Sequence, residues 1–287
     1  MKYLVVYPCN GLCNRLRAIA SGYILAQQLG RQFLLCWEPT PDIGTASFTD
    51  LFESQPYLVD SDTVTAMCAS TDFKSYVCGR QTESAVLADV CKDTSSIIVI
   101  RKSGGNYHHP SMSTGKFNSM KSTFYKSLTP VGELQDIISR YSDMVPKGSI
   151  GVHVRRTDRS CFTPATSVFV SKIKQLMGKT PVTTVFICSD DNQEIANIAN
   201  GIGSLVKTVT YDKRKFARDD VDSVKEAVIE WSILAHCTSI VFSHSSSFGY
   251  EACIVNRVSK LNAHELRSDS KRTENEKRNL PLLIYDD

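Results

Sequence analysis

The chain has 287 residues, with 33 Lys and Arg against 30 Asp and Glu and a formal net charge of +3. Hydrophobic residues make up 42% and charged residues 22% of it, which excludes a disordered chain, a coiled coil and a collagen. The net charge is too small to indicate nucleic-acid binding by bulk electrostatics. No run of about 18 apolar residues predicts a membrane span, and the N-terminus lacks a signal-peptide pattern. We therefore expect a cytoplasmic protein or a segment of a longer one.

The ten cysteines do not form a C-x-x-C pair, so a zinc ribbon or a thioredoxin motif is not indicated. Cys36 and Cys188 lie inside apolar runs, where a thiol packs as a small hydrophobic group. We expect reduced cysteines in the core. A disulfide among Cys68, Cys78 and Cys91 is the alternative in an oxidising compartment.

The first half of the chain opens with one βαβ unit. The expected elements in chain order are a strand at 3–7, a turn at 8–11, a helix at 12–29 that Gly30 ends, a strand at 31–37, an irregular region at 39–95, a strand at 96–100, a mobile surface loop at 103–122 and a helix at 131–141. Apolar spacing near 3.6 predicts the first helix, and short apolar runs predict the strands.

The second half repeats strand and helix more regularly, after a boundary at residues 145–149. We expect strands at 150–154, 183–188, 206–211 and 239–242, and helices at 168–177, 192–200, 223–236 and 249–256. This alternation predicts parallel sheets with helices on both faces. The expected fold class is α/β with two Rossmann-like domains, 1–145 and 146–287. After Ala263 we expect a charged tail or an exposed helix.

Ligands of open α/β sheets bind where the strands end, and the first polar strand end lies at residues 10–17. Gly11 opens the following helix, whose first amides could hold an anion. Asn14 and Arg15 lie in its first turn, and Arg15 adds positive charge. A plain turn with exposed arginines explains this segment equally well.

The second polar strand end is the sequence His153-Val154-Arg155-Arg156-Thr157-Asp158. A planar guanidinium binds two phosphate oxygens at once, and Asp158 could orient one of the arginines. A basic surface cluster is the alternative. We favour a functional site because the arginines follow an apolar strand of the predicted sheet.

Two further strand ends are polar. Ser245, Ser246 and Ser247 precede a predicted helix, where hydroxyl groups and free amides suit a phosphate or a sugar. Capping of that helix needs only one serine. Asp190 and Asp191 follow the strand at 183–188, and capping of the next helix is their alternative explanation. The sequence contains no phosphate-binding P-loop, no dinucleotide fingerprint and no nucleophile elbow.

Together these segments resemble one enzyme family. Residues 11–18, 34–37 and 48–52 resemble the amino end of bacterial nodulation-type and α1,6-fucosyltransferases. Residues 153–158 are similar to a motif of the α1,6-fucosyltransferases that protein O-fucosyltransferases carry in a looser form. Residues 188–191 and 242–252 match two more segments of the family in the same order.

The resemblance implies a GT-B glycosyltransferase whose two domains face each other across a cleft. It implies an inverting enzyme that moves L-fucose from GDP-fucose to a hydroxyl of an oligosaccharide or glycoprotein, without a metal or another cofactor. The first domain is then the acceptor side and the second binds the nucleotide sugar. No nucleic acid is an expected partner.

The resemblance also implies roles for single residues. Arg155 holds the β-phosphate and stabilises the leaving group. The other implied contacts are His153, Arg156 and Asp158 in the phosphate pocket, Asp190 or Asp191 at the guanine or ribose, Ser245, Ser246 and Ser247 at the pyrophosphate, and Gly11, Asn14 and Arg15 closing over it from the first domain.

The sequence departs from the family at the position of the catalytic base. The α1,6-fucosyltransferases carry a glutamate shortly after the arginine motif, whereas residues 160–163 here contain no acid. Asp50, Glu38 and Glu53 are other acids that could serve as the base. Alternatively, no base is needed because the bond to GDP breaks before the acceptor attacks. Two alternatives therefore stay open: another donor such as GDP-rhamnose or a UDP-sugar, and a nucleotide-sugar-binding module without catalysis.

Overall fold

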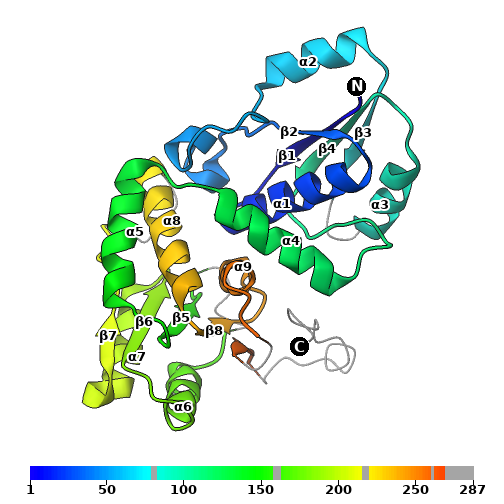
Figure 1. Ribbon diagram of the computed structural model, residues 1–287. Coiled ribbons are helices and arrows are strands. Elements are labelled where there is room, and N and C mark those ends of the chain that lie inside the picture. The colour runs from blue at the N-terminus through cyan, green and yellow to red at the C-terminus, as the bar shows by residue number, and fades with distance from the viewer. Residues whose placement is uncertain (79–82, 158–162, 215–219, 260–261, 269–287) are drawn as a thin grey trace. The chain divides into compact units, whose positions relative to one another are not determined.

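The computed structural model describes residues 1–78, 83–157, 163–214, 220–259 and 262–268. The chain divides into two compact units: unit 1 comprises Met1–Val131 and Arg218–Lys225, and unit 2 comprises Gly132–Ala217 and Glu226–Asp287. Each unit contains one parallel sheet with helices packed against it (Figure 1). The predicted α/β class is therefore confirmed.

Unit 1 is built on a four-stranded sheet with the order β2-β1-β4-β3, in which every pair is parallel. Its elements are β1 (Tyr3–Pro8), α1 (Leu12–Gln28), β2 (Gln32–Leu35), α2 (Ser61–Ser70), β3 (Phe73–Val77), α3 (Glu83–Lys92), β4 (Ile97–Ser103) and α4 (Thr114–Ser127), with short 3-10 turns at Pro41–Ile43 and Phe48–Asp50. β1 lies inside the sheet, between β2 and β4, and its residues Leu4, Val5 and Val6 are fully buried.

Two expectations for unit 1 are wrong. The region 39–95 contains α2, β3 and α3, and the predicted loop at 103–122 contains the start of α4. Ser113 caps α4 by accepting a hydrogen bond from the Lys116 backbone N–H. Phe117 and Lys121 are buried on this helix, and Lys121 donates to Asn106 Oδ1 at 2.7 Å. Because α4 is rich in polar residues, its buried face could not be recognised in the sequence.

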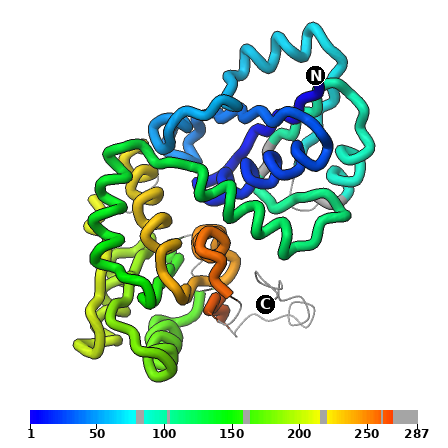
Figure 2. Tube along the Cα trace, viewed as in Figure 1, coloured from blue at the N-terminus to red at the C-terminus, as the bar shows by residue number. Residues whose placement is uncertain are grey.

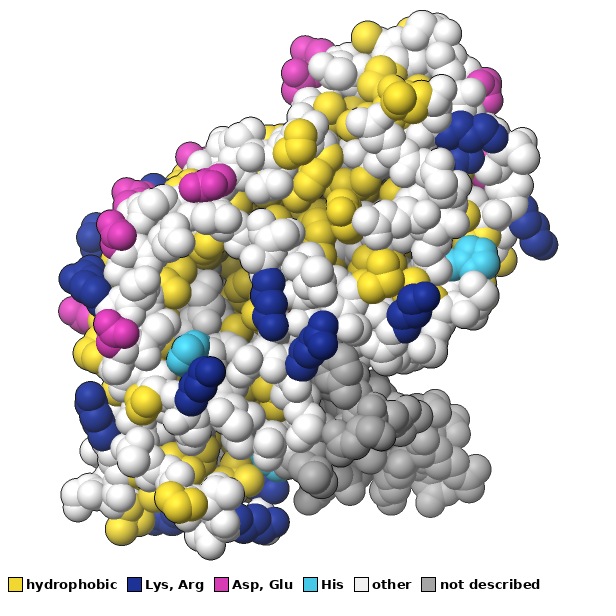
Figure 3. All heavy atoms as spheres, in the orientation of Figure 1, with side chains coloured by type: hydrophobic (Ala, Val, Ile, Leu, Met, Phe, Trp, Pro, Cys, Tyr) yellow, Lys and Arg dark blue, Asp and Glu magenta, His cyan; other side chains and the backbone are white. Residues whose placement is uncertain are grey.

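Hydrophobic side chains gather at the surface of unit 1 in the region of α2 (Figure 3). Phe73 on the edge strand β3 is 51% exposed. A cavity of about 330 Å³ lies at this place. Its lining residues are Val64, Thr65, Cys68, Ala69, Phe73, Ser75, Val99 and Arg101.

Unit 2 is built on a five-stranded parallel sheet with the order β7-β6-β5-β8-β9. Its elements are α5 (Gly132–Met144), β5 (Ile150–Val154), α6 (Thr166–Met177), β6 (Thr184–Ser189), α7 (Asn192–Ile202), a 3-10 turn (Gly203–Leu205), β7 (Lys207–Val209), α8 (Val221–His236), β8 (Ser239–Ser243), α9 (Ser247–Val255) and β9 (Ala263–Leu266). α8 begins among the residues grouped with unit 1.

The strand order of unit 2 contains a reversal beside β5. The chain runs outward from β5 to β6 and β7, then returns through α8 to β8, which pairs with β5 on its other side (Figure 2). Ligands of doubly wound sheets bind at such a switch point. All five residues of β5 are buried, so this strand forms the centre of the unit.

Two glycines allow helices to approach the central strands. A Cβ on Gly151 of β5 would lie 2.6 Å from Leu234 Cδ1 of α8, and one on Gly249 of α9 would lie 2.4 Å from Phe242 Cβ of β8. At Gly151 the Leu234 side chain would have to shift, whereas at Gly249 the Cβ would meet the base of the Phe242 side chain, so the second position requires glycine. The second contact sets the distance between α9 and the strand end at Ser243.

The remaining expectations differ in outcome. The boundary expected at 145/146 falls after α5, whereas the contacts group α5 with unit 2. The charged tail expected after Ala263 begins with β9, a strand paired with β8.

Nine cysteines are described and carry free thiols, as expected, and the alternative disulfide among Cys68, Cys78 and Cys91 does not form. Cys161 lies outside the described residues. No helix in the described ranges is long and apolar enough to cross a bilayer.

Candidate functional site

The carboxyl ends of β5 and β8 meet at the switch point of unit 2. β5 ends at Val154 and β8 at Ser243, and the two strands pair in parallel. The Arg155 backbone N–H donates to Ser243 Oγ at 2.9 Å. The structure thus brings the arginine segment and the serine segment together at one edge of one sheet.

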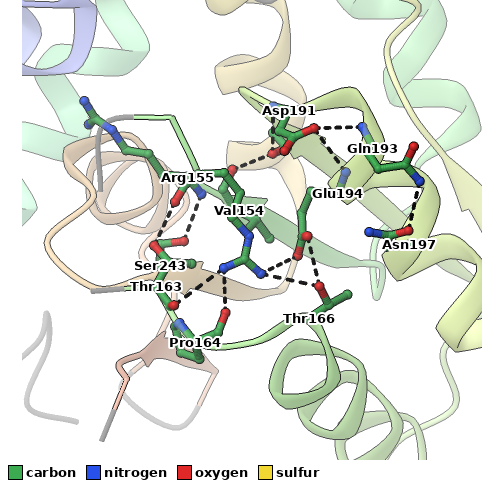
Figure 4. Close-up of polar contacts among 12 residues, drawn as sticks. Val154, Arg155, Thr163, Pro164, Thr166, Asp191, Gln193, Glu194, Asn197 and Ser243 are labelled. Carbon is green, nitrogen blue, oxygen red and sulfur yellow. Dashed lines mark hydrogen bonds and ion pairs between the residues drawn. The ribbon is translucent and has the colours of Figure 1, made fainter. Parts of the chain in front are cut away.

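Arg155 has a fixed backbone and a side chain that projects. Its carbonyl oxygen accepts a hydrogen bond from Thr163 Oγ1 at 2.7 Å, and its backbone N–H donates to Ser243 Oγ. Figure 4 shows the Arg155 side chain extending away from Glu194 and Thr166. The residue is partly exposed, and it places a positive charge at the carboxyl end of β5.

Arg156 is anchored inside unit 2. Its Nη2 lies 2.7 Å from Glu194 Oε1, and its Nη1 donates to the Pro164 carbonyl at 2.7 Å. Thr166 Oγ1 donates to the second Glu194 oxygen at 2.9 Å. The Glu194 side chain is only 6% exposed. Arg156 therefore ties the segment after β5 to the first turns of α6 and α7.

The two acids after β6 act within the protein. Asp190 accepts the Arg156 backbone N–H at 2.7 Å and the Thr157 hydroxyl at 2.6 Å. Asp191 caps α7 by accepting the backbone N–H groups of Gln193 and Glu194. Capping, the alternative explanation for this pair, is what Asp191 does. The expected contact of either acid with guanine or ribose stays a prediction.

His153 and Ser246 connect β5 to α9. Ser246 caps α9 by accepting the Gly249 backbone N–H, and its Oγ lies 3.2 Å from His153 Nδ1. The His153 ring stacks on Phe248, with centroids 4.7 Å apart. The first turn of α9, which begins at Ser247, is thereby held against the end of β5. Such a turn presents backbone N–H groups that favour an anion.

Ser245 is exposed and has a left-handed backbone with φ of 57°. Its hydroxyl lies 3.0 Å from His244 Nε2, and its backbone N–H donates to Glu265 Oε1 at 2.7 Å. The same Glu265 oxygen lies 2.6 Å from His244 Nδ1. Glu265 belongs to β9, which the sequence did not predict, and no motif indicated its place here.

Arg15 of unit 1 differs from the expectation. Its guanidinium is fully buried and donates to the Asn10 carbonyl at 2.9 Å, the Glu38 carbonyl at 2.9 Å and Thr40 Oγ1 at 2.6 Å. It also stacks over the Trp37 ring at 4.7 Å. Arg15 therefore holds the segment after β2 against the start of α1, and this geometry does not support a contact with pyrophosphate.

Gly11 and Asn14 lie at the start of α1, as predicted. Gly11 is the N-cap with φ of −67°, and the left-handed residue of this turn is Asn10, with φ of 65°. Glycine is therefore not required here by its own backbone angles. Asn14 lies in the first turn and is partly exposed. Their contact with the donor stays a prediction, and Asp158 lies outside the described residues.

A buried contact between Lys213 and Glu230 supports the strand end of β6. Lys213 lies 2.5 Å from Glu230 Oε2 of α8 and donates to the Ser189 carbonyl at 3.2 Å. Burial raises the pKa of Glu230 to about 7, against the opposing effect of Lys213. Glu230 Oε1 is buried without a hydrogen-bond partner. Among the described residues, no three His, Cys, Asp or Glu side chains could hold a metal ion together.

Comparison with known proteins finds similarity in structure only. No family model and no curated protein sequence matches the chain. NodZ α-1,6-fucosyltransferase soaked with GDP-fucose matches with a TM-score of 0.66 and 16% identity, over 89% of this chain and 93% of that one. An Arabidopsis thaliana FUT1 mutant in complex with GDP matches with a TM-score of 0.68 and 14% identity, over 96% and 72%.

POFUT1 in complex with GDP matches with a TM-score of 0.58 and 12% identity, over 92% of this chain and 98% of that one. The three matches cover both units of this chain, and each of those proteins has been solved with GDP or GDP-fucose. The resemblance predicted from the motifs is therefore confirmed in three dimensions, and the chain has the fold of the GDP-fucose fucosyltransferases.

Proposed function

We propose that the protein is an inverting, metal-independent glycosyltransferase that moves L-fucose from GDP-fucose to a hydroxyl of a glycan. One observation carries the proposal: Arg155 follows β5 at the switch point of unit 2, and its backbone N–H donates to Ser243 at the end of β8, the strand that leads into α9. A diphosphate placed there meets a guanidinium and a helix N-terminus together. The likeness to proteins solved with GDP or GDP-fucose supports the choice of donor.

The proposed chemistry concentrates on the leaving group. As the bond between the anomeric carbon and the phosphate oxygen breaks, the sugar gains oxocarbenium character and negative charge grows on the diphosphate. Donors fixed toward that charge lower the barrier because they need no reorganisation during the reaction. Arg155 supplies paired N–H donors, and the first turn of α9 supplies backbone N–H groups.

Other residues support this arrangement from behind. Arg156, Asp190 and Glu194 fix the segment that carries Arg155, so we assign them positioning roles. Asp50, one substitute considered for the missing base, accepts hydrogen bonds from the Ser47 backbone N–H and hydroxyl. We assign no base: the bond between the sugar and GDP breaks first, and the acceptor hydroxyl oxygen then bonds to the anomeric carbon and releases its proton to solvent.

The test measures GDP release from GDP-fucose, with and without a panel of glycan acceptors. Replacing Arg155 by alanine removes one oxyanion-type donor and lowers turnover by about 100-fold or more. Arg155→Lys restores only part of it, because an ammonium lacks the paired donors of a guanidinium. Arg140→Ala, at an exposed position on α5, is the matched control and keeps full activity.

Each other outcome has a defined meaning. Near-normal turnover of Arg155→Ala refutes the assigned site. Transfer from GDP-rhamnose or a UDP-sugar, with none from GDP-fucose, shows that the donor is another nucleotide sugar and leaves the assigned site unchanged. Binding of GDP-fucose without transfer or hydrolysis identifies a binding module instead of an enzyme.

A further inference from the structure

Three side chains beside the proposed phosphate site form one hydrogen-bonded chain. Ser245 Oγ lies 3.0 Å from His244 Nε2, and His244 Nδ1 lies 2.6 Å from Glu265 Oε1. They come from the end of β8 and from β9, which pair in parallel. Ser245 is exposed, whereas the side chains of His244 and Glu265 are 15% and 11% exposed. The chain thus runs from a shielded carboxylate to an accessible hydroxyl.

Glu265 determines which nitrogen of His244 can exchange its proton. An ionised carboxylate only accepts hydrogen bonds, and its Oε1 already accepts the Ser245 backbone N–H at 2.7 Å. Nδ1 must therefore carry a hydrogen and donate to Glu265. Nε2, which faces Ser245 Oγ, is the nitrogen that is protonated in the imidazolium and bare in the neutral ring.

The hydroxyl of Ser245 has a single hydrogen. When His244 is neutral, Ser245 donates that hydrogen to Nε2 and turns lone pairs toward solvent. When His244 is an imidazolium, Nε2–H donates to Ser245 Oγ, and the hydroxyl hydrogen is available to a ligand. The charge state of His244 therefore decides whether Ser245 offers a donor or an acceptor.

We propose that His244 and Glu265 are positioning residues that turn Ser245 into a hydrogen-bond donor for the diphosphate while His244 is protonated. This inference rests on the proposed function, because it assumes that the diphosphate binds beside Ser245. It adds a donor to those supplied by Arg155 and α9. It also makes nucleotide affinity depend on pH in the range where histidine exchanges its proton, between about pH 5 and 8.

Other charged groups lie on the elements packed around β8. β9 carries His264 next to Glu265, and burial, then Lys172 and Lys179, lower the pKa of His264 to about 4, so it stays neutral through that range. α9 carries Glu251, which is fully buried. β5 carries His153 and leads to Arg155. A pH effect of His153 persists when only His244 is replaced, which separates the two histidines.

The experiment measures GDP affinity by titration calorimetry between pH 5.5 and 8.5. For the natural protein we expect the affinity to fall about 10-fold as His244 loses its proton, the effect of one hydrogen bond to a charged group. In His244→Gln no group titrates at this position, and in Ser245→Ala no hydroxyl is switched. Both variants lose the fall.

His236→Gln is the matched control. This histidine ends α8 just before β8 begins, at the amino-terminal ends of the strands and away from the proposed site. The variant keeps the pH dependence of the natural protein. Ionisation of GDP itself is common to all variants. An unchanged pH dependence in His244→Gln or Ser245→Ala overturns the inference and leaves the proposed function intact. Absence of GDP binding at every pH overturns both.

Discussion

Two adjacent arginines have different surroundings in this protein. Arg155 is held through its backbone and projects its guanidinium, whereas Arg156 is held through its guanidinium in contact with Glu194 and Pro164. Alternation along an extended chain places consecutive side chains on opposite sides. The first arginine therefore reaches the edge of the sheet and the second reaches into the layer of α6 and α7. We therefore assign Arg155 to the ligand and Arg156 to the support of its segment.

Replacing Arg156 by alanine should destabilise the protein. Glu194 then remains buried without its ion pair, and the free energy of unfolding falls by about 2–3 kcal/mol. Urea unfolding measures the change. Lys174→Ala, at an exposed position on the neighbouring α6, changes it by less than about 0.5 kcal/mol. A stability of Arg156→Ala equal to that of the natural protein would show that the contact with Glu194 is not structural.

Glu230 makes stability depend on pH. Burial raises its pKa from 4.5 to about 7, so between these values the folded protein holds a proton that the unfolded chain has released. The free energy of unfolding therefore decreases as pH rises through this window, by up to about 3 kcal/mol, and levels off above it.

Glu230→Gln cannot lose a proton and should lack this decrease. Unfolding in urea at pH 5 and pH 7.5 gives the difference between variant and natural protein. Asp136→Asn, at an exposed position on α5, keeps the slope of the natural protein. Identical slopes for Glu230→Gln and the natural protein would mean that this carboxyl is ionised throughout.

At the scale of elements, the packing of α9 on β8 sets the site. The absent side chain of Gly249 lets the helix lie against Phe242. The N-cap Ser246 then reaches His153 on the adjacent strand. The first turn of α9 and the end of β5 consequently share one position at the edge of the sheet.

Gly249→Ala should disturb this packing. Its Cβ would meet Phe242 Cβ at 2.4 Å, so the helix must move, and we expect a loss of about 1–3 kcal/mol in the free energy of unfolding. The movement also separates Ser246 from His153 and weakens GDP binding. Gly132→Ala in α5, where a Cβ has no neighbour within 4 Å, is neutral or stabilising by up to about 1 kcal/mol. Equal stabilities of the two variants would contradict this packing.

Elements with a strong period could be predicted from the sequence. The apolar runs of β1, β5 and β6 and the helical spacing of α1 and α7 lie within two residues of their predicted places. The errors fall where composition misleads. α4 looks like a polar loop but buries Phe117 and Lys121, and β9 lies at the edge of the charged C-terminal region.

At the scale of the whole molecule, the topology of each sheet explains why motifs far apart in sequence belong to one site. Strand ends of a parallel sheet share one edge, so the polar segments after β5, β6 and β8 could be placed together in advance. The partners that hold them could not. Glu194 lies in a helix and Glu265 on an edge strand, and no local pattern marks which helix or strand packs there. At Arg15 the local pattern was present and misleading: the motif placed this residue at the ligand, whereas it is buried and has a structural role.

A crystal of the protein soaked with GDP-fucose tests the central claim most directly. The phosphates are expected within hydrogen-bonding distance of the Arg155 guanidinium and of the first-turn N–H groups of α9, with Arg156 still bound to Glu194. A diphosphate bound away from the ends of β5 and β8, or an Arg155 side chain that does not touch it, would contradict the claim.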